Sequence, residues 1–167
     1  RLTIISGGPG TGKTSTVSKI LAILLQADCN TLKIGLAAPT GKAAMRLQLS
    51  VDSSLETLSC PEETRSSIPR EAKTLHRLLG ARQNSPQFLH DGDNPMILDI
   101  VVVDEASMID LALMSKLVDA LKPGSRLILL GDKDQLSSVE SGAVLADCIR
   151  SLPGNTVELR KTYRFDA

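Results

Sequence analysis

The chain has 167 residues, of which 42% are hydrophobic, and its 19 basic side chains balance its 19 acidic ones. A chain of this length and apolarity can bury a core of its own, which excludes global disorder. The balanced charge excludes a bulk basic surface, so any contact with a polyanion must be local, and one Tyr and two Phe are too few to form rows of stacking rings for single strands.

The first predicted elements are a strand, a glycine-rich loop and a helix. An apolar run predicts a strand at Leu2–Ser6, and apolar residues at helical spacing predict a helix over Gly12–Gln26. Between them, residues 7–14 read GGPGTGKT, a complete G-x-x-x-x-G-K-T phosphate loop in the strand–loop–helix setting that the motif requires. Its glycines let successive N–H groups converge on an anion at the positive end of the helix dipole. The sequence therefore predicts a nucleoside triphosphate site.

Two residues of this loop have predicted chemical roles. We expect Lys13 to reach the β- and γ-phosphates and the Thr14 hydroxyl to hold Mg²⁺. Gly-rich turns before helices also occur without a ligand, but here the strand, the lysine and the hydroxyl are all in place. The predicted nucleotide-binding residues are Gly7, Gly8, Pro9, Gly10, Thr11, Gly12, Lys13, Thr14 and Ser15.

The next part of the chain predicts one further strand–helix pair and two less regular segments. The strand is expected at Lys33–Ala38 and the helix at Gly41–Leu49. Residues 51–73 are rich in Ser, Glu, Thr and Pro and poor in apolar periodicity, so we expect a mobile insertion or linker there. In residues 84–98, short apolar pieces flank the turn-forming residues 91–94, which predicts a small hairpin.

The strand predicted at Ile100–Asp104 ends in an acidic pair. We expect Asp104 to bind Mg²⁺ through water, because this small ion keeps much of its hydration. Glu105 can then polarise the water that attacks the γ-phosphate. Taken alone, an Asp-Glu pair is better explained as a solvated strand end or a helix cap. The apolar strand before it and the phosphate loop favour the catalytic role.

Two strands and two helices complete the prediction. They are helices at Leu111–Leu121 and Ala143–Arg150 and strands at Arg126–Gly131 and Thr156–Leu159. Gln135 follows the first of these strands as a neutral side chain that could touch the γ-phosphate or the attacking water. An ordinary polar turn is the alternative explanation for it.

The order of these elements predicts a doubly wound α/β fold. Strands alternate with helices, and three strands are apolar runs without polar alternation, as a parallel sheet covered on both faces requires. Sheets of this kind bind ligands at the carboxyl ends of their strands. We therefore expect the chemistry at residues 7–14, 39–42, 104–107 and 131–135.

Six segments in this order resemble superfamily-1 DNA helicases, and specifically the RecD family, the alpha subunits of exodeoxyribonuclease V. They are GGPGTGKT (7–14), APTGKAA (38–44), TLHRLLG (74–80), VDEASMID (103–110), GDKDQL (131–136) and YRF (163–165). The resemblance extends over nearly the whole chain apart from residues 51–73, and the segment 137–145 favours the RecD subunit. It implies a RecA-like P-loop NTPase fold, the first motor domain of a helicase, and ATP and Mg²⁺ as cofactors.

The resemblance also implies residue roles that spacing alone does not give. Thr14 and Asp104 match the magnesium ligands of such helicases, and Arg164 matches the arginine that they supply to the phosphate chain. Gln135 matches their γ-phosphate contact. The implied catalytic residues are Lys13, Glu105, Gln135 and Arg164.

Two further segments match motifs that contact single-stranded DNA. Lys42 would start a helix, where side chain and dipole both favour a backbone phosphate. A solvated surface lysine is the alternative for Lys42, and a purely structural histidine is the alternative for His76. The implied DNA-binding residues are Pro39, Thr40, Gly41, Lys42, Thr74 and His76.

By resemblance, the function is ATP-driven movement on single-stranded DNA in the 5′ to 3′ direction. The resemblance implies assembly with the beta and gamma subunits of a helicase–nuclease that acts in double-strand-break repair and recombination. Two alternatives stay open: a stand-alone superfamily-1 helicase, and a nucleotide-binding switch or assembly module with little turnover. Dependence of hydrolysis on single-stranded DNA separates the motor from the switch.

Cysteine usage and the ends of the chain give the last expectations. Cys29, Cys60 and Cys148 are odd in number and form no C-x-x-C, so we expect reduced, mostly buried thiols in a cytoplasmic protein. No apolar stretch approaches the length that spans a membrane. Residues 1–167 match one motor domain without the upstream adenine-reading glutamine or the second motor domain of these helicases, so we expect a fragment of a longer protein.

Overall fold

A six-stranded, all-parallel sheet forms the centre of the molecule. The computed structural model describes residues 1–82, 85, 87–132 and 143–161. The strands are β1 (Leu2–Gly7), β2 (Ile34–Ala38), β3 (Ala72–Thr74), β4 (Ile100–Val103), β5 (Arg126–Gly131) and β6 (Thr156–Leu159). Their order in the sheet is β3-β2-β4-β5-β1-β6.

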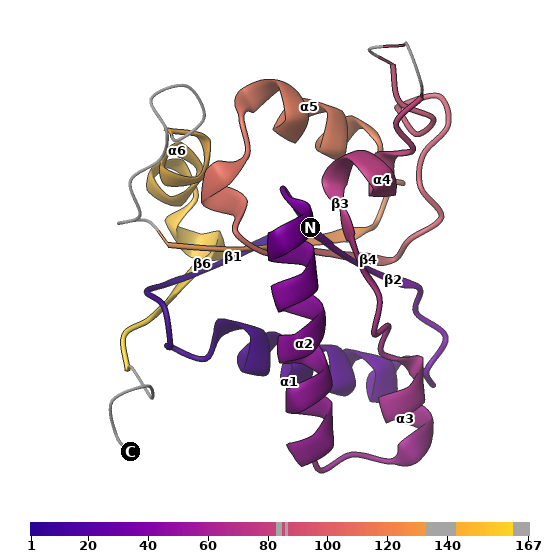
Figure 1. The fold of residues 1–167 in the computed structure, drawn as a ribbon, viewed down its shortest axis with the longest axis vertical. Helices are drawn as coiled ribbons and strands as arrows, with labels where there is room; N and C mark the ends of the chain where they lie inside the picture. Colours follow the sequence, from indigo (N-terminus) through magenta and orange to yellow (C-terminus); the bar gives the residue numbers. More distant parts are fainter. Residues whose placement is uncertain (83–84, 86, 133–142, 162–167) are drawn as a thin grey trace.

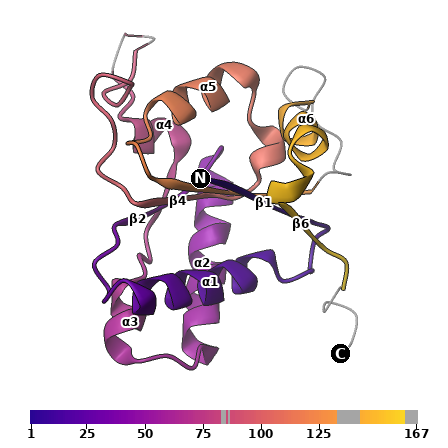
Figure 2. The same ribbon diagram turned by 180° about the vertical axis from the view of Figure 1, so that it is seen from behind.

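Helices cover both faces of this sheet, as the views from the front and from behind show (Figures 1 and 2). On one face lie α1 (Lys13–Ala27), α2 (Gly41–Thr57) and α3 (Glu62–Ser67). On the other lie α4 (Leu75–Leu79), α5 (Leu111–Asp119) and α6 (Ala143–Ser151). Two short 3-10 helices, η1 (Ala106–Met108) and η2 (Pro153–Asn155), join strands to helices. The predicted doubly wound α/β fold is therefore confirmed.

The apolar strands are buried because successive side chains serve two separate cores. In β4, Val101 packs into the core under α4, α5 and α6, while Val102 packs into the core under α1, α2 and α3. In β5, Leu129 and Leu130 divide between the two cores in the same way. Side chains alternate between faces along a strand, so a sheet with two covered faces needs apolar residues at every position. This explains the unbroken apolar runs of the sequence.

The regular elements follow the sequence prediction closely. All five predicted strands and all four predicted helices are present, and their ends agree within two residues except for the end of α2. The structure adds elements that are not among these nine, namely β3, α3, α4, η1 and η2.

The prediction of an irregular linker at residues 51–73 is wrong for most of the segment. The helix α2 continues to Thr57, and α3 and β3 follow it. Val51 and Leu55 continue the buried face of α2 at 2% and 1% exposure. The polar composition misled the prediction, because the buried residues of this helix are few and four positions apart.

The hairpin predicted in residues 84–98 is also wrong for the part of the segment that is described. The turn itself is present, since Asp91 Oδ1 accepts hydrogen bonds from two following N–H groups at 3.0 and 2.9 Å. Its flanks, however, do not pair with each other. They form isolated bridges elsewhere, Ala81 with Phe88 and Met96 with Leu121. Each flank pairs instead with a residue that follows a helix, Ala81 after α4 and Leu121 after α5, so no two-stranded ladder stands behind the turn.

The cysteines differ partly from expectation. Cys29 is exposed, and Cys60 and Cys148 are half-buried, so "mostly buried" is wrong for Cys29. All three are free thiols. Burial, followed by the nearby Asp147 carboxylate, raises the pKa of the Cys148 thiol. Within the described part of the chain, no helix has both the length and the apolarity needed to cross a lipid bilayer.

Candidate functional site

The carboxyl ends of the central strands bring distant segments to one edge of the sheet. β5 lies between β1 and β4, with Ser6 opposite Gly131 and Val103 opposite Leu129. The phosphate loop after β1, the acidic pair after β4 and Asp132 after β5 therefore leave the sheet next to one another. Parallel strands end at a common edge, which is where such folds bind ligands.

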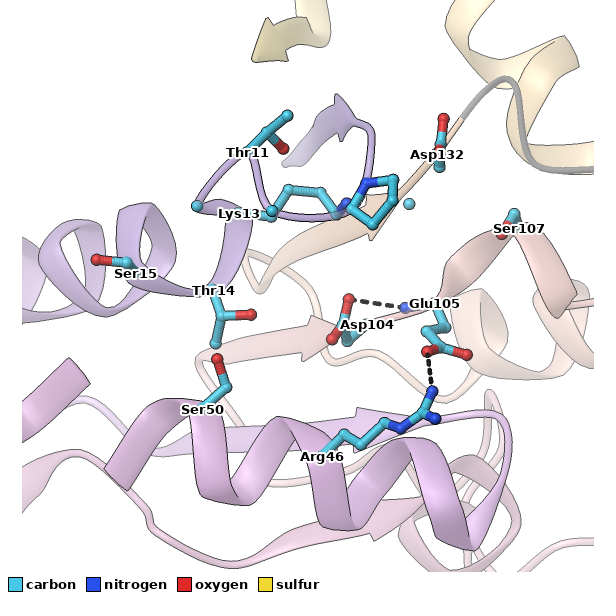
Figure 3. Close-up of a pocket in the computed structure, with 14 residues that line it drawn as sticks. Thr11, Lys13, Thr14, Ser15, Arg46, Ser50, Asp104, Glu105, Ser107 and Asp132 are labelled. Carbon is cyan, nitrogen blue, oxygen red and sulfur yellow. Dashed lines mark hydrogen bonds and ion pairs between the residues drawn. The ribbon is translucent and has the colours of Figure 1, made fainter. Parts of the chain in front are cut away.

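A pocket of about 800 Å³ opens at this edge (Figure 3). Four parts of the chain contribute to it: the phosphate loop with the start of α1, the loop after β4, the end of β5, and one face of α2. Its lining residues are Pro9, Gly10, Thr11, Gly12, Lys13, Thr14, Ser15, Arg46, Ser50, Asp104, Glu105, Ser107, Gly131 and Asp132. The pocket thus brings the predicted residues 9–15 together with the acidic pair.

The phosphate loop ends in a helix terminus that faces the pocket. Gly10 and Gly12 have φ angles of 82° and 78°, a left-handed conformation that glycine adopts without strain. Gly12 is the N-cap of α1 and offers no side chain to the first turn. The N–H groups at the start of a helix have no helical carbonyl to bond, and the helix dipole adds positive potential there. This end of α1 suits a phosphate group.

Lys13 lies across the loop. Its ammonium donates hydrogen bonds to the carbonyl oxygens of Gly7 and Gly8, the second at 3.1 Å. Thr11 Oγ1 also donates to Gly8 O, at 2.8 Å. The two donors hold the turn of the loop in shape, and the ammonium keeps a positive charge beside the pocket.

The acidic pair occupies two different environments. Burial raises the pKa of Asp104, although the N–H that Glu105 donates to Asp104 Oδ1 (2.8 Å) and the Lys13 ammonium act in the opposite direction. Glu105 has a φ of 50°, a left-handed conformation that few non-glycine residues adopt. This conformation ends β4 abruptly and begins η1, so the neighbouring carboxylates leave the chain in different directions. Strain of this kind is concentrated at functional sites.

Sequence reasoning missed a basic residue that contacts Glu105. Arg46 of α2 lines the pocket, and its Nη1 lies 3.7 Å from Glu105 Oε1 (Figure 3). Ser50 lines the pocket from one turn further along the same helix. The signal was present in the sequence: Lys42, Arg46 and Ser50 are four residues apart and share one face of α2.

Two more polar residues of the pocket were not singled out. Ser107 and Asp132 are only 7% and 8% exposed. Both lie in segments, 104–107 and 131–135, where the sequence predicted chemistry. Their side chains were overlooked because the interpretation of these two segments concentrated on Asp104, Glu105 and Gln135.

The side chains in the pocket fit a magnesium ion that is shared with a nucleotide. Thr14 and Asp104 both line the pocket, and the Thr14 hydroxyl turns toward Asp104 (Figure 3). Mg²⁺ keeps several waters and takes only one or two protein ligands, the rest coming from phosphates. This agrees with the absence, among the described residues, of any cluster of three or more His, Cys, Asp or Glu that could hold a metal. A carboxylate whose pKa burial has raised is also one whose charge a cation would stabilise.

The residues predicted to contact DNA lie at the neighbouring strand ends and not in the pocket. Residues 39–42 follow β2, and Thr74 ends β3 opposite Ala38 in the strand register. The two segments are therefore adjacent on the same edge of the sheet. Lys42 and His76 are exposed, and the His76 ring meets Phe88 edge to face at 5.7 Å.

Both threonines of this set have a structural role. Thr40 Oγ1 accepts a hydrogen bond from the Ala43 N–H at 3.2 Å and caps α2. Thr74 Oγ1 accepts one from the Arg77 N–H at 3.2 Å and caps α4. Their place in the sequence is therefore explained by helix capping, whether or not they touch DNA. Gln135 and Arg164, predicted as catalytic, lie outside the described residues.

Comparison with known proteins gives consistent matches. A family model described as "AAA domain" matches residues 1–141. The RecBCD enzyme subunit RecD of Mycolicibacterium smegmatis is 48% identical over 170 residues, which cover 98% of this chain and 30% of that protein. The ATP-dependent RecD2 DNA helicase of Deinococcus radiodurans is 42% identical over 165 residues, covering 98% of this chain and 20% of that protein. The chain thus spans less than a third of the length of these relatives.

A solved structure supports the fold. The Pif1 helicase from Candida albicans superposes with a TM-score of 0.62 over 97% of this chain and 36% of that one, at 20% sequence identity. At this identity the likeness concerns the fold alone, and it agrees with a RecA-like P-loop α/β architecture.

Proposed function

The chain belongs to the AAA domain family, with the sequence of a RecD-type superfamily-1 motor domain, and from this premise we propose that it binds and hydrolyses ATP to drive movement on DNA. The observation that carries the proposal is the pocket in which Lys13, Thr14, Asp104 and Glu105 meet. These residues come from segments about ninety positions apart, and together they supply what phosphoryl transfer requires: a phosphate cradle, a metal ligand and a carboxylate base.

Binding of the triphosphate would depend on the start of α1 and on Lys13. The glycine-rich turn and the first N–H groups of α1 would surround the β-phosphate, and the nine predicted loop residues, 7–15, contribute to this cradle. On binding, the Lys13 ammonium would leave the carbonyls of Gly7 and Gly8 for the β- and γ-phosphates. The exchange replaces two neutral acceptors by charged ones, which form stronger hydrogen bonds.

Hydrolysis would depend on the acidic pair. Thr14 and Asp104 would hold Mg²⁺, and this ion would neutralise charge that develops on the phosphates. Glu105 would orient and deprotonate the attacking water, since its side chain reaches the pocket from the loop after β4. Gln135 and Arg164 are proposed to contact the γ-phosphate and the phosphate chain, which rests on the motif resemblance.

We propose the DNA substrate and the partner subunits from the names of the relatives. The relatives are named as RecBCD subunits and as a DNA helicase, which supports single-stranded DNA as the track. We place the strand at the adjacent ends of β2 and β3, against Pro39, Thr40, Gly41, Lys42, Thr74 and His76. We further propose 5′ to 3′ movement and a place in a complex with the beta and gamma subunits of exodeoxyribonuclease V, acting in repair and recombination in the cytoplasm. The stand-alone helicase remains the second candidate, because the RecD2 relative is named as a helicase.

The test is Glu105→Gln in the intact protein. The amide keeps the shape of the carboxylate but cannot take a proton, so we expect the kcat of DNA-stimulated ATP hydrolysis to fall by about 10²- to 10⁴-fold with ATP affinity retained. Steady-state phosphate release and equilibrium nucleotide binding measure the two quantities. Glu56→Gln is the matched control, since Glu56 is exposed on α2 outside the pocket.

Two results would contradict the proposal. Undiminished hydrolysis by the Glu105→Gln protein would remove Glu105 as the base. Hydrolysis by the unmodified protein that is indifferent to single-stranded DNA would favour the nucleotide switch. Strand displacement on duplexes with a 5′ or a 3′ tail tests the direction separately.

A further inference from the structure

Helix α2 connects the proposed DNA-binding edge with the nucleotide pocket. Its first residues, Gly41 and Lys42, belong to the segment proposed to hold the DNA backbone. Arg46 and Ser50, one and two turns later, line the pocket. A helix rises 1.5 Å per residue, so Lys42 and Arg46 are separated by only about 6 Å along its axis. A displacement of the first turn of α2 would therefore also move Arg46.

Within the described part of the chain, the Glu105 carboxylate forms its ion pair with a residue of this helix. Glu105 Oε1 is 3.7 Å from Arg46 Nη1, and the two side chains are 33% and 65% exposed. The backbone of Glu105 is fixed by its left-handed conformation, but its side chain is not enclosed. The direction of the carboxylate therefore depends on its ionic partner more than on packing.

The contact is weak enough to be switched. Exposed ion pairs change an equilibrium by no more than about fivefold, because solvent screens them and both side chains lose freedom. A small shift of α2 is then sufficient to break or redirect the pair. The first turn of α2 is also anchored differently from the rest: Ala43 and Ala44 pack in a small cluster with Ala38, apart from the large core that holds the later turns.

We propose that Arg46 is a positioning residue that holds the Glu105 carboxylate away from its working direction until DNA at the start of α2 shifts the helix. This inference rests on the proposed function and deepens it, because it assigns the coupling between DNA binding and hydrolysis to one ion pair. At 3.7 Å the guanidinium attracts the carboxylate without a hydrogen bond and turns it along the line that joins the two groups. Release of Arg46 frees Glu105 to take the proton of the attacking water.

The test is Arg46→Ala in the intact protein. We expect ATP hydrolysis without DNA to rise about two- to fivefold, the range of an exposed ion pair, and the stimulation ratio with single-stranded DNA to fall by the same factor. The KM for ATP is expected to stay unchanged, and the affinity for single-stranded DNA is expected to rise by no more than the same two- to fivefold, because DNA no longer has to break the pair. Arg46→Lys, which keeps the charge, is expected to restore most of the stimulation ratio, and Arg46→Gln to behave as Arg46→Ala.

The chain offers a closely matched control. Arg70 Nη1 lies 3.6 Å from Asp52 Oδ1 of α2, with side chains 63% and 33% exposed, so this pair has nearly the same length and exposure. Neither residue lines the pocket. Arg70→Ala is expected to leave both hydrolysis rates unchanged.

The other possible results of the Arg46→Ala experiment would each overturn the inference or the proposed function. An unchanged stimulation ratio in Arg46→Ala overturns the inference, and so does an equal fall of both rates or a raised KM, which would mean that Arg46 binds the nucleotide itself. If single-stranded DNA fails to stimulate the unmodified protein, the proposed function falls and the inference with it. Stimulation of the unmodified protein together with an unchanged ratio in the variant overturns the inference alone.

Discussion

Two neighbouring carboxylates of the pocket differ in environment in a way that suits different tasks. Burial raises the pKa of Asp104, and a bound cation would offset that cost. Glu105, one residue on, is a third exposed and is held by an arginine. Pairs of acidic groups in unlike surroundings commonly divide the work of a site between them. Here the enclosed carboxylate suits a metal, and the accessible one suits water.

A third carboxylate, at the opposite edge of the sheet, is structural. Asp99 accepts hydrogen bonds from the Lys33 N–H at 2.7 Å and from Lys122 Nζ at 2.6 Å. Its own carbonyl accepts from the Arg126 N–H at 2.8 Å. The side-chain hydrogen bond from Lys122, followed by the Lys33 N–H, lowers the pKa of Asp99 below its usual 3.8. One residue thus joins the starts of β2, β4 and β5.

We predict that Asp99→Asn destabilises the protein by about 1 kcal/mol at neutral pH, a value reduced for the solvent exposure of the pair. Because the pKa of Asp99 is lowered in the folded state, its contribution is complete above 3.8 and is lost as the pH falls through the folded value. The difference in unfolding free energy between the two proteins should therefore begin to shrink below pH 3.8 and disappear once the pH lies below the folded pKa of Asp99. Denaturant unfolding at a series of pH values measures it. Asp93→Asn, on an exposed turn, is the control, and a difference that does not vary with pH would contradict the assignment.

At the level of single residues, the sequence revealed the part of the pocket that is contiguous along the chain. Residues 7–15 and the acidic pair were predicted because each forms a short motif next to an apolar strand. Arg46 and Ser50 were missed because they belong to the pocket only through the packing of α2 against the sheet. No local pattern encodes that packing, although their spacing along one helix face gave a partial signal.

The second half of α2 shows why an element can be longer than its composition suggests. Leu55 is 1% exposed and packs in the core beneath α1, α2 and α3, whereas Leu49 of the same helix is 66% exposed. We predict that Leu55→Ala destabilises the protein by about 2–5 kcal/mol, because it leaves a cavity in a packed core. Leu49→Ala should change stability by less than about 0.5 kcal/mol. Thermal or denaturant unfolding compares the two, and equal effects would mean that residues 51–57 are not a packed helix.

Prediction of elements succeeded where apolar residues were dense and failed where they were sparse. The strands β4 and β5 are apolar at nearly every position, and α1 repeats buried residues at helical spacing, so each could be recognised from the sequence. In residues 51–73, a few buried side chains stand among many serines, threonines and glutamates, and composition outweighed spacing. The predicted hairpin failed for another reason: turn chemistry fixes a turn but not the partners of its flanks.

At the scale of the molecule, the Asp99 contacts that stabilise the sheet and the residues of the pocket lie at opposite ends of the strands. The Asp99 hydrogen bonds join strand starts at one edge, and the pocket occupies the opposite edge, where β1, β4 and β5 end. Two cores hold the strands between these edges from both faces. This arrangement places side chains from segments about ninety residues apart within one pocket.

The pocket suggests that residues 1–167 bind nucleotide but do not complete its chemistry alone. Arg46 and Glu105 are 65% and 33% exposed, so water reaches the proposed base freely. Efficient hydrolysis requires that bulk solvent be excluded around the single attacking water, and that a second surface close over the phosphates. We predict that the chain of 167 residues, expressed by itself, gains thermal stability with Mg²⁺ and ATP but shows slow hydrolysis, little stimulation by single-stranded DNA and no strand displacement.

Lys13→Ala controls this last experiment, since loss of the ammonium should remove the nucleotide-dependent gain in melting temperature and leave the fold intact. The same assays on the intact protein, in matched buffer and at matched DNA concentration, give the reference rates. Strong DNA-stimulated hydrolysis by the 167 residues alone would show that a single RecA-like domain already closes its own site. The pocket would then have to be enclosed by this chain itself, and the exposure of Glu105 would describe only its nucleotide-free form.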